Sequence, residues 1–380
     1  MKRKLIVLVV SFFVITAGCW MWPDQELSEA ERRALKQKPE LNMENVMNGS
    51  FMSDFESYTL DQFPLRDQLR SLKALAEYGL FQKKDNNDLY VKDGYVAQIL
   101  YPLSENSVNN AAKKFGEIYE KFLTGSDGRI FVSAVPDKGY YMAQANGYPA
   151  LDYQKMFGML ADGMDYAKFI DISGALQLED YYKTDSHWRQ EKLLPVMEVL
   201  LTAMNEGTAY AGSTARNLSI LDEAELVTAT EDFRGVYYGQ SALPLPAETI
   251  NYLTWDEIED CEGFNFEINQ EVDVYQLDKL TACDPYDIFL GGAAALITVE
   301  NPAAAARAEA AGEAPRELIL FRDSFGSSIA PLFLADYSKI TLVDIRYMQS
   351  SMLDQFIEFD GQDVLFLYGT TMLNDSFTFK

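Results

Sequence analysis

Compact apolar runs recur along the chain and predict the strands of a buried sheet. The first of them is 129–136, and similar runs follow at 167–172, 316–321, 340–344 and 363–368. Helical patterns at 151–163, at 191–204 and from about Ser328 lie between these runs. Apolar strands that alternate with helices are typical of a mainly parallel sheet covered on both faces, so we predict an α/β fold.

The region before the first strand has a different pattern. Residues 52–78 predict helix around a break at Phe63-Pro64, and Leu69, Leu72, Leu75 and Leu80 recur at roughly helical spacing. The Asp93-Gly94 turn within 88–96 predicts a β-hairpin, and 108–122 predicts another helix. We expect Asp61 and Arg66, on either side of the break, to form a structural ion pair.

Residues 208–315 interrupt the alternation of strands and helices. Short aromatic runs such as 235–238 and 272–275 have a strand-like pattern, and the alanine-rich stretch 302–315 predicts an exposed helical or loose excursion. We interpret 208–315 as a β-rich insertion between the second and third core strands, in the role of a lid or a sugar-binding platform. The predicted domain of 51–380 contains this insertion.

The N-terminus has the composition of a targeting segment. Residues 1–4 are basic, 5–18 are apolar, and Cys19 follows. Residues 1–22 are therefore a cleaved secretory signal, a lipoprotein signal with Cys19 as the lipidation site, or an uncleaved membrane anchor, and 23–50 form a polar tether. All three alternatives place the rest of the chain outside the cytoplasm, either membrane-tethered or secreted.

Composition limits the partners and cofactors. The hydrophobic content of 48% suffices for a large core, and the net charge of −26 argues against nucleic acid as a partner. Cys261 and Cys283 are candidates for a disulfide in an oxidising compartment, although two unpaired thiols fit the sequence equally well. No nucleotide-binding loop, haem motif or metal-ligand cluster is present in the sequence, so no cofactor or metal is expected.

The chain has one histidine, His187, and it stands two residues after Asp185. Ser324 follows the predicted strand 316–321, at a turn from strand to helix. Serine, histidine and aspartate together can form a nucleophilic triad, which is defined by roles and geometry and not by chain order. Each residue also has a structural interpretation, in which Ser324 or Asp185 caps a helix and His187 is part of the core.

Several segments together resemble one known family. They are Thr184-Asp185-Ser186-His187-Trp188, Asp61 to Asp67, Val135 to Lys138, Phe289 to Gly292 and Arg322 to Ser328. The chain resembles the DHHW family of SGNH-hydrolase-like proteins, related to the AlgX/AlgJ-type polysaccharide O-acetylation proteins. The resemblance implies a three-layer α/β/α SGNH-like fold with Ser324 as nucleophile, His187 as base and Asp185 as its partner.

The chain also departs from the family pattern. Ser186 replaces the first histidine of the motif, Arg322 replaces the glycine before Asp-Ser, and Ala293 replaces the asparagine after Gly-Gly. The substrate or oxyanion candidates are Arg322, Phe325, Lys138, Asn374 and Trp188.

Two functions are compatible with this sequence. The first is extracytoplasmic acyl transfer or hydrolysis, of O-acetyl groups above all, on a cell-surface polysaccharide. A transferase would require a membrane partner that delivers acyl groups. The alternative is a non-catalytic carbohydrate-binding or polysaccharide-assembly protein with the same fold.

Overall fold

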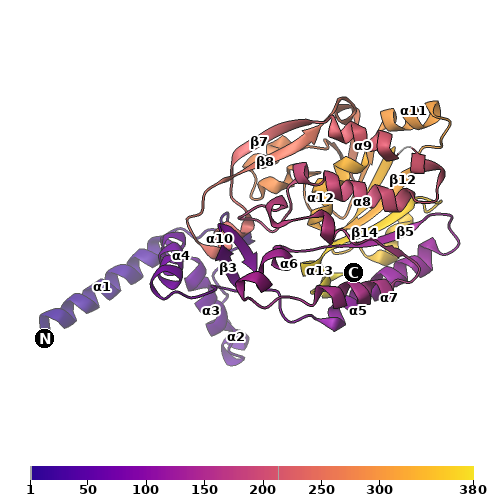
Figure 1. Ribbon diagram of the computed structural model, residues 1–380. Coiled ribbons are helices and arrows are strands. Elements are labelled where there is room, and N and C mark those ends of the chain that lie inside the picture. The colour runs from indigo at the N-terminus through magenta and orange to yellow at the C-terminus, as the bar shows by residue number, and fades with distance from the viewer. Residues whose placement is uncertain (1, 213) are drawn as a thin grey trace. The chain divides into compact units, whose positions relative to one another are not determined.

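The computed structural model describes residues 2–212 and 214–380, except for the side chains of residues 2, 3, 8, 15–17, 19, 20 and 215–217. The chain divides into two compact units. Unit 1 contains Met1–Val91 and Val236–Pro246, and unit 2 contains Lys92–Gly235 and Ala247–Lys380. Figure 1 shows the ribbon with many of these elements labelled.

Unit 1 is mainly helical. Its helices are α1 (Lys2–Met21), α2 (Met43–Met47), α3 (Ser50–Asp61), α4 (Arg66–Leu75), the π-helical turn η1 (Ala76–Leu80) and α10 (Val236–Ser241). Its strands are β1 (Leu27–Ser28), β2 (Arg33–Ala34) and β3 (Leu89–Lys92). The predicted break at Phe63-Pro64 is confirmed, because α3 ends before it and α4 begins after it. The predicted ion pair is also present, with 3.5 Å between Arg66 Nη2 and Asp61 Oδ1.

Unit 2 is built on an eight-stranded sheet with the order β10-β9-β11-β13-β12-β14-β5-β6. The strands that pair in parallel are β13 (Lys339–Val343), β12 (Glu317–Arg322), β14 (Asp363–Gly369), β5 (Ile130–Val135) and β6 (Lys168–Phe169). Strands β11 (Leu296–Glu300), β9 (Glu262–Asn265) and β10 (Gln270–Val272) extend one edge in antiparallel pairs. The predicted mainly parallel α/β sheet is therefore confirmed.

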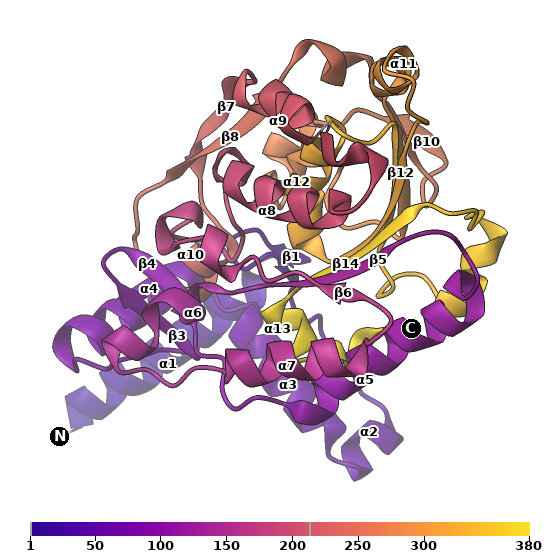
Figure 2. The ribbon, with the colours of Figure 1, turned by 45° about the vertical axis from the view of Figure 1, so that its right-hand side comes forward.

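Alternate residues of the central strands enter two separate cores. Leu318 and Leu320 of β12 pack with helices α8 (Leu194–Asn205) and α12 (Ser324–Phe333), whereas Ile319 and Phe321 pack with α5 (Glu105–Ile118) and α7 (Tyr153–Gly163). Figure 2 shows these two helix pairs on opposite faces of the sheet. Because successive side chains of a strand point to opposite faces, this pattern produces the predicted α/β/α layers.

Unit 2 contains further α-helices and strands. They are β4 (Tyr95–Gln98), α6 (Lys138–Met142), α9 (Thr214–Asp222), α11 (Pro302–Ala310) and α13 (Thr370–Leu373), together with the separate antiparallel pair β7 (Glu225–Phe233) and β8 (Glu248–Thr254). Strands β3 and β4 flank the predicted Asp93-Gly94 turn, and both turn residues have positive φ. The stretch after Asn301 forms a regular helix, which the Asn301 side chain caps.

The insertion is only partly β-rich. Strands β9, β10 and β11 come from it and join the main sheet. The expectation of a strand at 235–238 is wrong, because α10 begins at Val236. A four-residue apolar run does not show whether its period is 2 or 3.6, which explains this error. The expected strand at 272–275 is present only at its first residue, Val272, where β10 ends.

The N-terminal segment is helical from Lys2 to Met21. The side chain of Cys19, the lipidation candidate, lies outside the described residues. Among the residues that the structure describes, no helix combines the length and the apolar character needed to cross a membrane. The cleaved-signal, lipoprotein and anchor alternatives stay predictions.

Candidate active site

The site lies at the carboxyl ends of the parallel strands. Ser324 is the first residue of α12 and follows the central strand β12 after one intervening residue. His187 belongs to a loop that an isolated bridge between Tyr181 and Trp188 closes, and the Tyr182 amide donates to the His187 carbonyl at 3.1 Å. Ligand and catalytic groups of open α/β sheets gather at this edge.

Asp185, His187 and Ser324 are hydrogen-bonded in series. His187 Nδ1 lies 2.6 Å from Asp185 Oδ1, and His187 Nε2 lies 2.7 Å from Ser324 Oγ. With the Asp185 carboxylate ionised, Nδ1 donates to it, and Nε2 is then free to accept the Ser324 hydroxyl proton. This is the order of contacts in which a histidine can act as base towards a serine.

Asp323, and not Ser324, caps α12. The Asp323 side chain accepts from the Phe325 amide at 3.0 Å and from the Gly369 amide at 2.7 Å. The cap therefore also joins the ends of β12 and β14, which are neighbours in the sheet. Burial raises the pKa of Asp323. Because Asp323 satisfies the helix end, the Ser324 hydroxyl is available to His187.

Ser324 is accessible in a buried segment. Of residues 318–335, all are buried except Ser324, which is partly exposed. The predicted helix start near Ser328 is therefore too late, because α12 already begins at Ser324. A nucleophile at the first turn of a helix also lies close to backbone N–H groups and the positive end of the helix dipole, both of which favour a developing oxyanion.

The loop that carries Asp185 is held from two sides. The Glu248 carboxylate accepts from the amides of Lys183 and Thr184 at 2.7 Å each, and from the Thr184 hydroxyl at 2.6 Å. On the other side, the buried Lys138 ammonium donates to the carbonyls of Tyr182 and Lys183 at 3.0 and 3.1 Å. Burial lowers the pKa of Lys138 to about 7. Lys138 therefore holds the backbone of this loop through two hydrogen bonds.

Aromatic rings fix the orientation of the imidazole. The Tyr286 ring stacks on His187 with 4.0 Å between centroids and 10° between planes, and the Phe325 ring lies 5.1 Å away. The Tyr286 hydroxyl and Trp188 Nε1 both donate to Ser328 Oγ, at 2.7 and 2.9 Å. Trp188 is completely buried, and this placement does not support the expected direct contact with a substrate.

Arg322, the last residue of β12, is also completely buried. Its guanidinium donates to the Gly292 carbonyl at 3.0 Å and to Ser327 Oγ at 3.1 Å. Leu290, Gly291 and Gly292 all have positive φ, so Arg322 holds a sharply bent loop against α12. This placement does not support the expected direct contact of Arg322 with a substrate.

The remaining residues that the sequence suggested differ in whether they lie at the triad. Phe325 contacts the triad through its side chain, at the ring of His187. Asn374 accepts from the Ser104 amide at 2.7 Å and donates to the Pro102 carbonyl, so it holds another loop and is not joined to the triad. Cys261 and Cys283 are both thiols in the structure, so the candidate disulfide is not formed.

Sequence reasoning missed three residues that build the site. Glu248, Tyr286 and Gly235 all come from the insertion, and Gly235 packs directly on Asp185. The insertion therefore supplies one wall of the site, where the sequence suggested a lid or platform. None of the three belongs to a motif, because their partners are between about 50 and 100 residues away along the chain.

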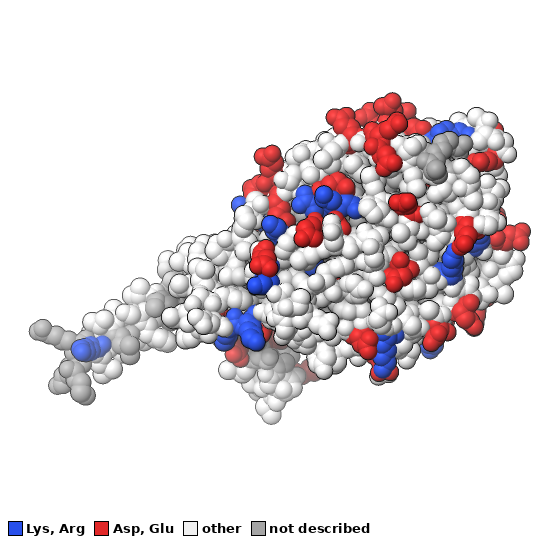
Figure 3. Space-filling model, in the orientation of Figure 1, with Lys and Arg blue, Asp and Glu red and all other residues white. Residues whose placement is uncertain are grey.

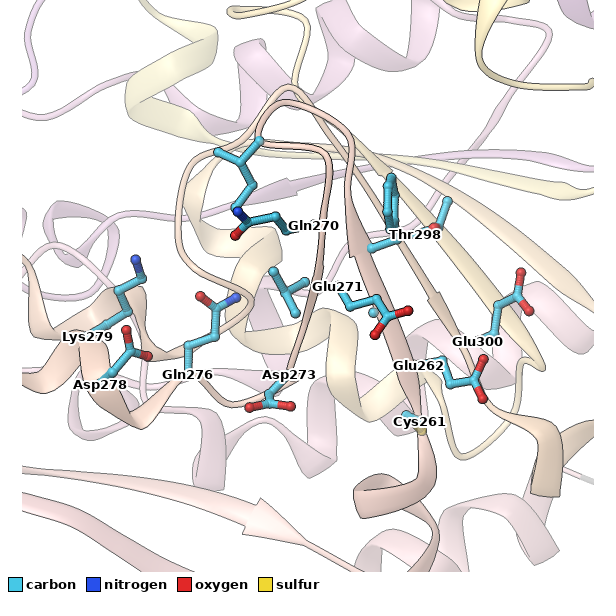
Figure 4. A pocket seen from close by; sticks show the side chains of 14 residues that line it. Cys261, Glu262, Gln270, Glu271, Asp273, Gln276, Asp278, Lys279, Thr298 and Glu300 are labelled. Carbon is cyan, nitrogen blue, oxygen red and sulfur yellow. The ribbon is translucent and has the colours of Figure 1, made fainter.

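A pocket of about 760 Å³ lies elsewhere in unit 2, along β9, β10 and β11 (Figure 4). Its lining includes the carboxylates Glu262, Glu271, Asp273, Asp278 and Glu300, and none of the triad residues. This acidic lining disfavours anionic ligands. Among the described side chains, no three or more His, Cys, Asp or Glu residues are placed to hold a metal ion.

The chain was compared with known proteins. No protein-family model and no curated protein matches it. A crystal structure of a DHHW family protein from Eubacterium siraeum matches with a TM-score of 0.55 and 19% identity, over 76% of this chain and 93% of that one. The structure of Bacillus cereus PatB1 with a sulfonyl adduct matches with a TM-score of 0.57 and 14% identity, over 75% and 97%.

The O-acetyltransferase domain of Pseudomonas putida AlgJ is a more distant match, with a TM-score of 0.43 and 10% identity over 75% of this chain and 92% of that one. At their identities the matches to the DHHW family protein and to PatB1 establish the fold alone. The chain has the α/β fold of the DHHW family protein and of PatB1.

Proposed function

We propose that the protein is an extracytoplasmic acyltransferase or esterase that acts on O-acyl groups of a cell-surface polysaccharide. The observation that carries this proposal is the pair of short contacts Asp185–His187 and His187–Ser324, with Ser324 accessible at the helix start. The acetyl group and the polysaccharide come from the resemblance to DHHW proteins. The extracytoplasmic location comes from the N-terminal sequence.

The reaction follows from the order of the contacts. Ser324 Oγ attacks the acyl carbonyl while His187 Nε2 takes the hydroxyl proton, and Asp185 stabilises the imidazolium that forms. The tetrahedral intermediate collapses, the C–O bond to the donor alcohol breaks, and His187 returns the proton to that alcohol. An acceptor hydroxyl then gives its proton to His187 and attacks the acyl-Ser324 ester. The bond between the acyl carbon and Ser324 Oγ breaks, His187 returns the proton to Ser324 Oγ, and the acylated acceptor is released.

The acceptor distinguishes a transferase from an esterase. If the acceptor is water, the product is a free carboxylic acid. If it is a sugar hydroxyl, the acyl group moves to a new ester. Both reactions pass through the same acyl-Ser324 intermediate, so one intermediate tests both versions of the proposal.

The direct test is to detect that intermediate. Purified protein is mixed with 4-nitrophenyl acetate, nitrophenolate release is followed, and the protein mass is recorded after rapid acid quenching. We expect one added acetyl group, mapped to Ser324, and none in Ser324→Ala. Acetylated and unacetylated glycans are then offered as donors and acceptors. The enzymatic proposal fails if the folded wild type releases no nitrophenolate from the activated ester and acquires no acetyl group from either the activated ester or the acetylated glycans.

A second function is favoured by the departures from the family motif. Ser186, Arg322 and Ala293 replace three family residues, and Arg322 is wholly buried in contact with Gly292 and Ser327. A non-catalytic carbohydrate-binding or polysaccharide-assembly protein would tolerate such changes. This alternative predicts that Ser324→Ala binds the same glycans on an array with the same affinity as the wild type, and that neither protein acquires acetyl.

A further inference from the structure

Helix α4 turns its leucines outwards and its arginines inwards. Leu69 and Leu72 are 45% and 64% exposed, whereas the side chains of Arg66 and Arg70 are only 14% and 21% exposed. Ala74 is the residue of α4 that is fully buried. A surface helix of a protein surrounded by water normally has the opposite arrangement, with its apolar stripe on the core.

Ion pairs within unit 1 fix this orientation. The carboxylate of Glu31 binds the guanidinium of Arg66 and, at 2.9 Å, that of Arg70. Arg70 also donates to the Gln240 carbonyl at 3.2 Å. Because α4 cannot rotate without breaking these contacts, the exposed leucines are a stable feature of the unit.

Four exposed leucines of this segment are here called the leucine stripe. It consists of Leu65, Leu69, Leu72 and Leu80, of which Leu65, Leu72 and Leu80 are at least 60% exposed. Their spacing of four, three and eight residues places them on one side of the segment formed by the N-cap residue Leu65, α4 and η1. The exposed Lys73 borders the stripe. In Figure 3 the surface over α4 is largely uncharged.

The charge of the chain is distributed very unequally. Residues 1–91 contain 12 Lys and Arg against 13 Asp and Glu, and 236–246 contain none, so these segments carry only −1 of the total of −26. The remaining residues carry −25. Figure 3 shows many acidic side chains on the visible face of unit 2. An anionic lipid surface repels such a unit, but it does not repel a nearly neutral unit.

Unit 1 also contains a second exposed apolar helix. The exposed large apolar side chains of α1 include Leu5, Ile6, Val7, Val9, Val10, Phe12, Phe13 and Val14. Helix α4 itself combines leucines on one face with two arginines and a lysine on the others. Arg66 and Arg70 are paired with Glu31, so Lys73 is the exposed cation of α4, and an exposed lysine beside an exposed leucine face is typical of helices that lie in the interface of a bilayer.

We propose that the leucine stripe of α4 is a lipid-binding face, which rests on the surface of a bilayer with α4 parallel to the membrane plane. The proposal is independent of the reaction at Ser324. It assigns unit 1 to the membrane surface, and the negative charge of the remaining residues favours their orientation towards the aqueous side.

The test measures whether lipid reaches the stripe in the full chain. The variant Leu72→dansylalanine is mixed with vesicles of phosphatidylcholine and phosphatidylglycerol, with and without brominated acyl chains. The matched control is Leu226→dansylalanine, because Leu226 is 54% exposed in β7 of unit 2. We expect the dansyl emission at position 72 to shift to shorter wavelength and to be strongly quenched by brominated lipid. At position 226 we expect neither change. Adding Leu65→Glu and Leu69→Glu should remove about half or more of the quenching at position 72.

Iodide, a quencher that stays in water, distinguishes the other possible covers of the stripe. Without vesicles, iodide should quench the probe at position 72. A probe that iodide cannot reach under these conditions is covered by protein, either another part of this chain or a second copy, and that result overturns the proposal. The absence of quenching by brominated lipid in the folded variant, when the protein is bound to vesicles, also overturns it.

Discussion

Gly235 packs so closely on Asp185 that a side chain does not fit between them. A Cβ atom at position 235 would lie 2.3 Å from the Asp185 Cβ and 2.4 Å from the Thr184 carbonyl oxygen. The Gly235 amide also donates to the Thr184 hydroxyl at 3.1 Å. The insertion thus determines where the loop of Asp185 and His187 can lie.

Gly235→Ala should displace Asp185 and misalign His187. A displacement of about 1 Å among catalytic groups can lower the rate about 100-fold. We therefore expect Gly235→Ala to release nitrophenolate from 4-nitrophenyl acetate about 100-fold more slowly than the wild type. The control is Gly174→Ala, because no atom lies within 4 Å of a Cβ at that position. Equal activity of Gly235→Ala and the wild type, with both folded by circular dichroism, would show that the loop position does not depend on this contact.

Glu248→Gln tests the clamp on the same loop. A glutamine offers one acceptor oxygen where the carboxylate offers two, and its amide would face donors. We therefore expect about 1–3 kcal/mol less stability in urea unfolding, together with a slower reaction of Ser324. Glu179→Gln, at an exposed glutamate two residues before the loop begins, is the control and should change neither quantity.

The Tyr286 ring and its hydroxyl can be tested separately. Tyr286→Phe keeps the stack on His187 and loses only the bond to Ser328, whereas Tyr286→Leu loses both. A stacked aromatic pair is worth about 1 kcal/mol, so we expect Tyr286→Leu to react about fivefold more slowly than Tyr286→Phe. Identical acylation rates for the two variants would assign the ring a packing role only.

Lys138 predicts a dependence of stability on pH. Burial lowers its pKa from the ordinary 10.5 to about 7, with Asp185, Glu248 and Asp137 as the acidic groups near it. The unfolded chain therefore binds more protons between pH 7 and 10.5. The contribution of Lys138 to the free energy of unfolding is fully present above pH 10.5. As the pH decreases from 10.5 to 7, this contribution falls by up to about 1.4 kcal/mol per pH unit.

The measurement is urea unfolding of the wild type and Lys138→Met between pH 7 and 9. The difference in unfolding free energy, wild type minus variant, should rise with pH. Lys113→Met, at a lysine whose side chain is 74% exposed, should show no such trend. A difference for Lys138→Met that is constant over this range would mean that Lys138 titrates normally.

The core strands could be predicted from the sequence because they depend on local information, and the family resemblance pointed to Asp185, His187 and Ser324 as neighbours. Apolar runs specify β5, β12, β13 and β14, and a single histidine leaves one candidate base. The walls of the site could not be predicted. Tyr286 and Glu248 reach the His187 loop only through the tertiary fold of the insertion, and no local pattern encodes these contacts.

Burial also could not be predicted residue by residue. Arg322 and Lys138 have the side chains expected of substrate ligands, but both donate to backbone carbonyls inside the protein. The leucine spacing of α4 correctly predicted a helix, yet periodicity alone does not show which environment the apolar face meets.

The central claim is that His187 activates Ser324. A serine-directed sulfonyl fluoride probe is applied to the wild type, Ser324→Ala, His187→Ala and the control Ser186→Ala, and the modified residue is mapped by mass spectrometry. We predict labelling at Ser324 in the wild type and Ser186→Ala, none at this position in Ser324→Ala, and labelling about 100-fold slower in His187→Ala. Folded wild-type protein that is not labelled, or labelling at Ser324 that does not depend on His187, would contradict the claim.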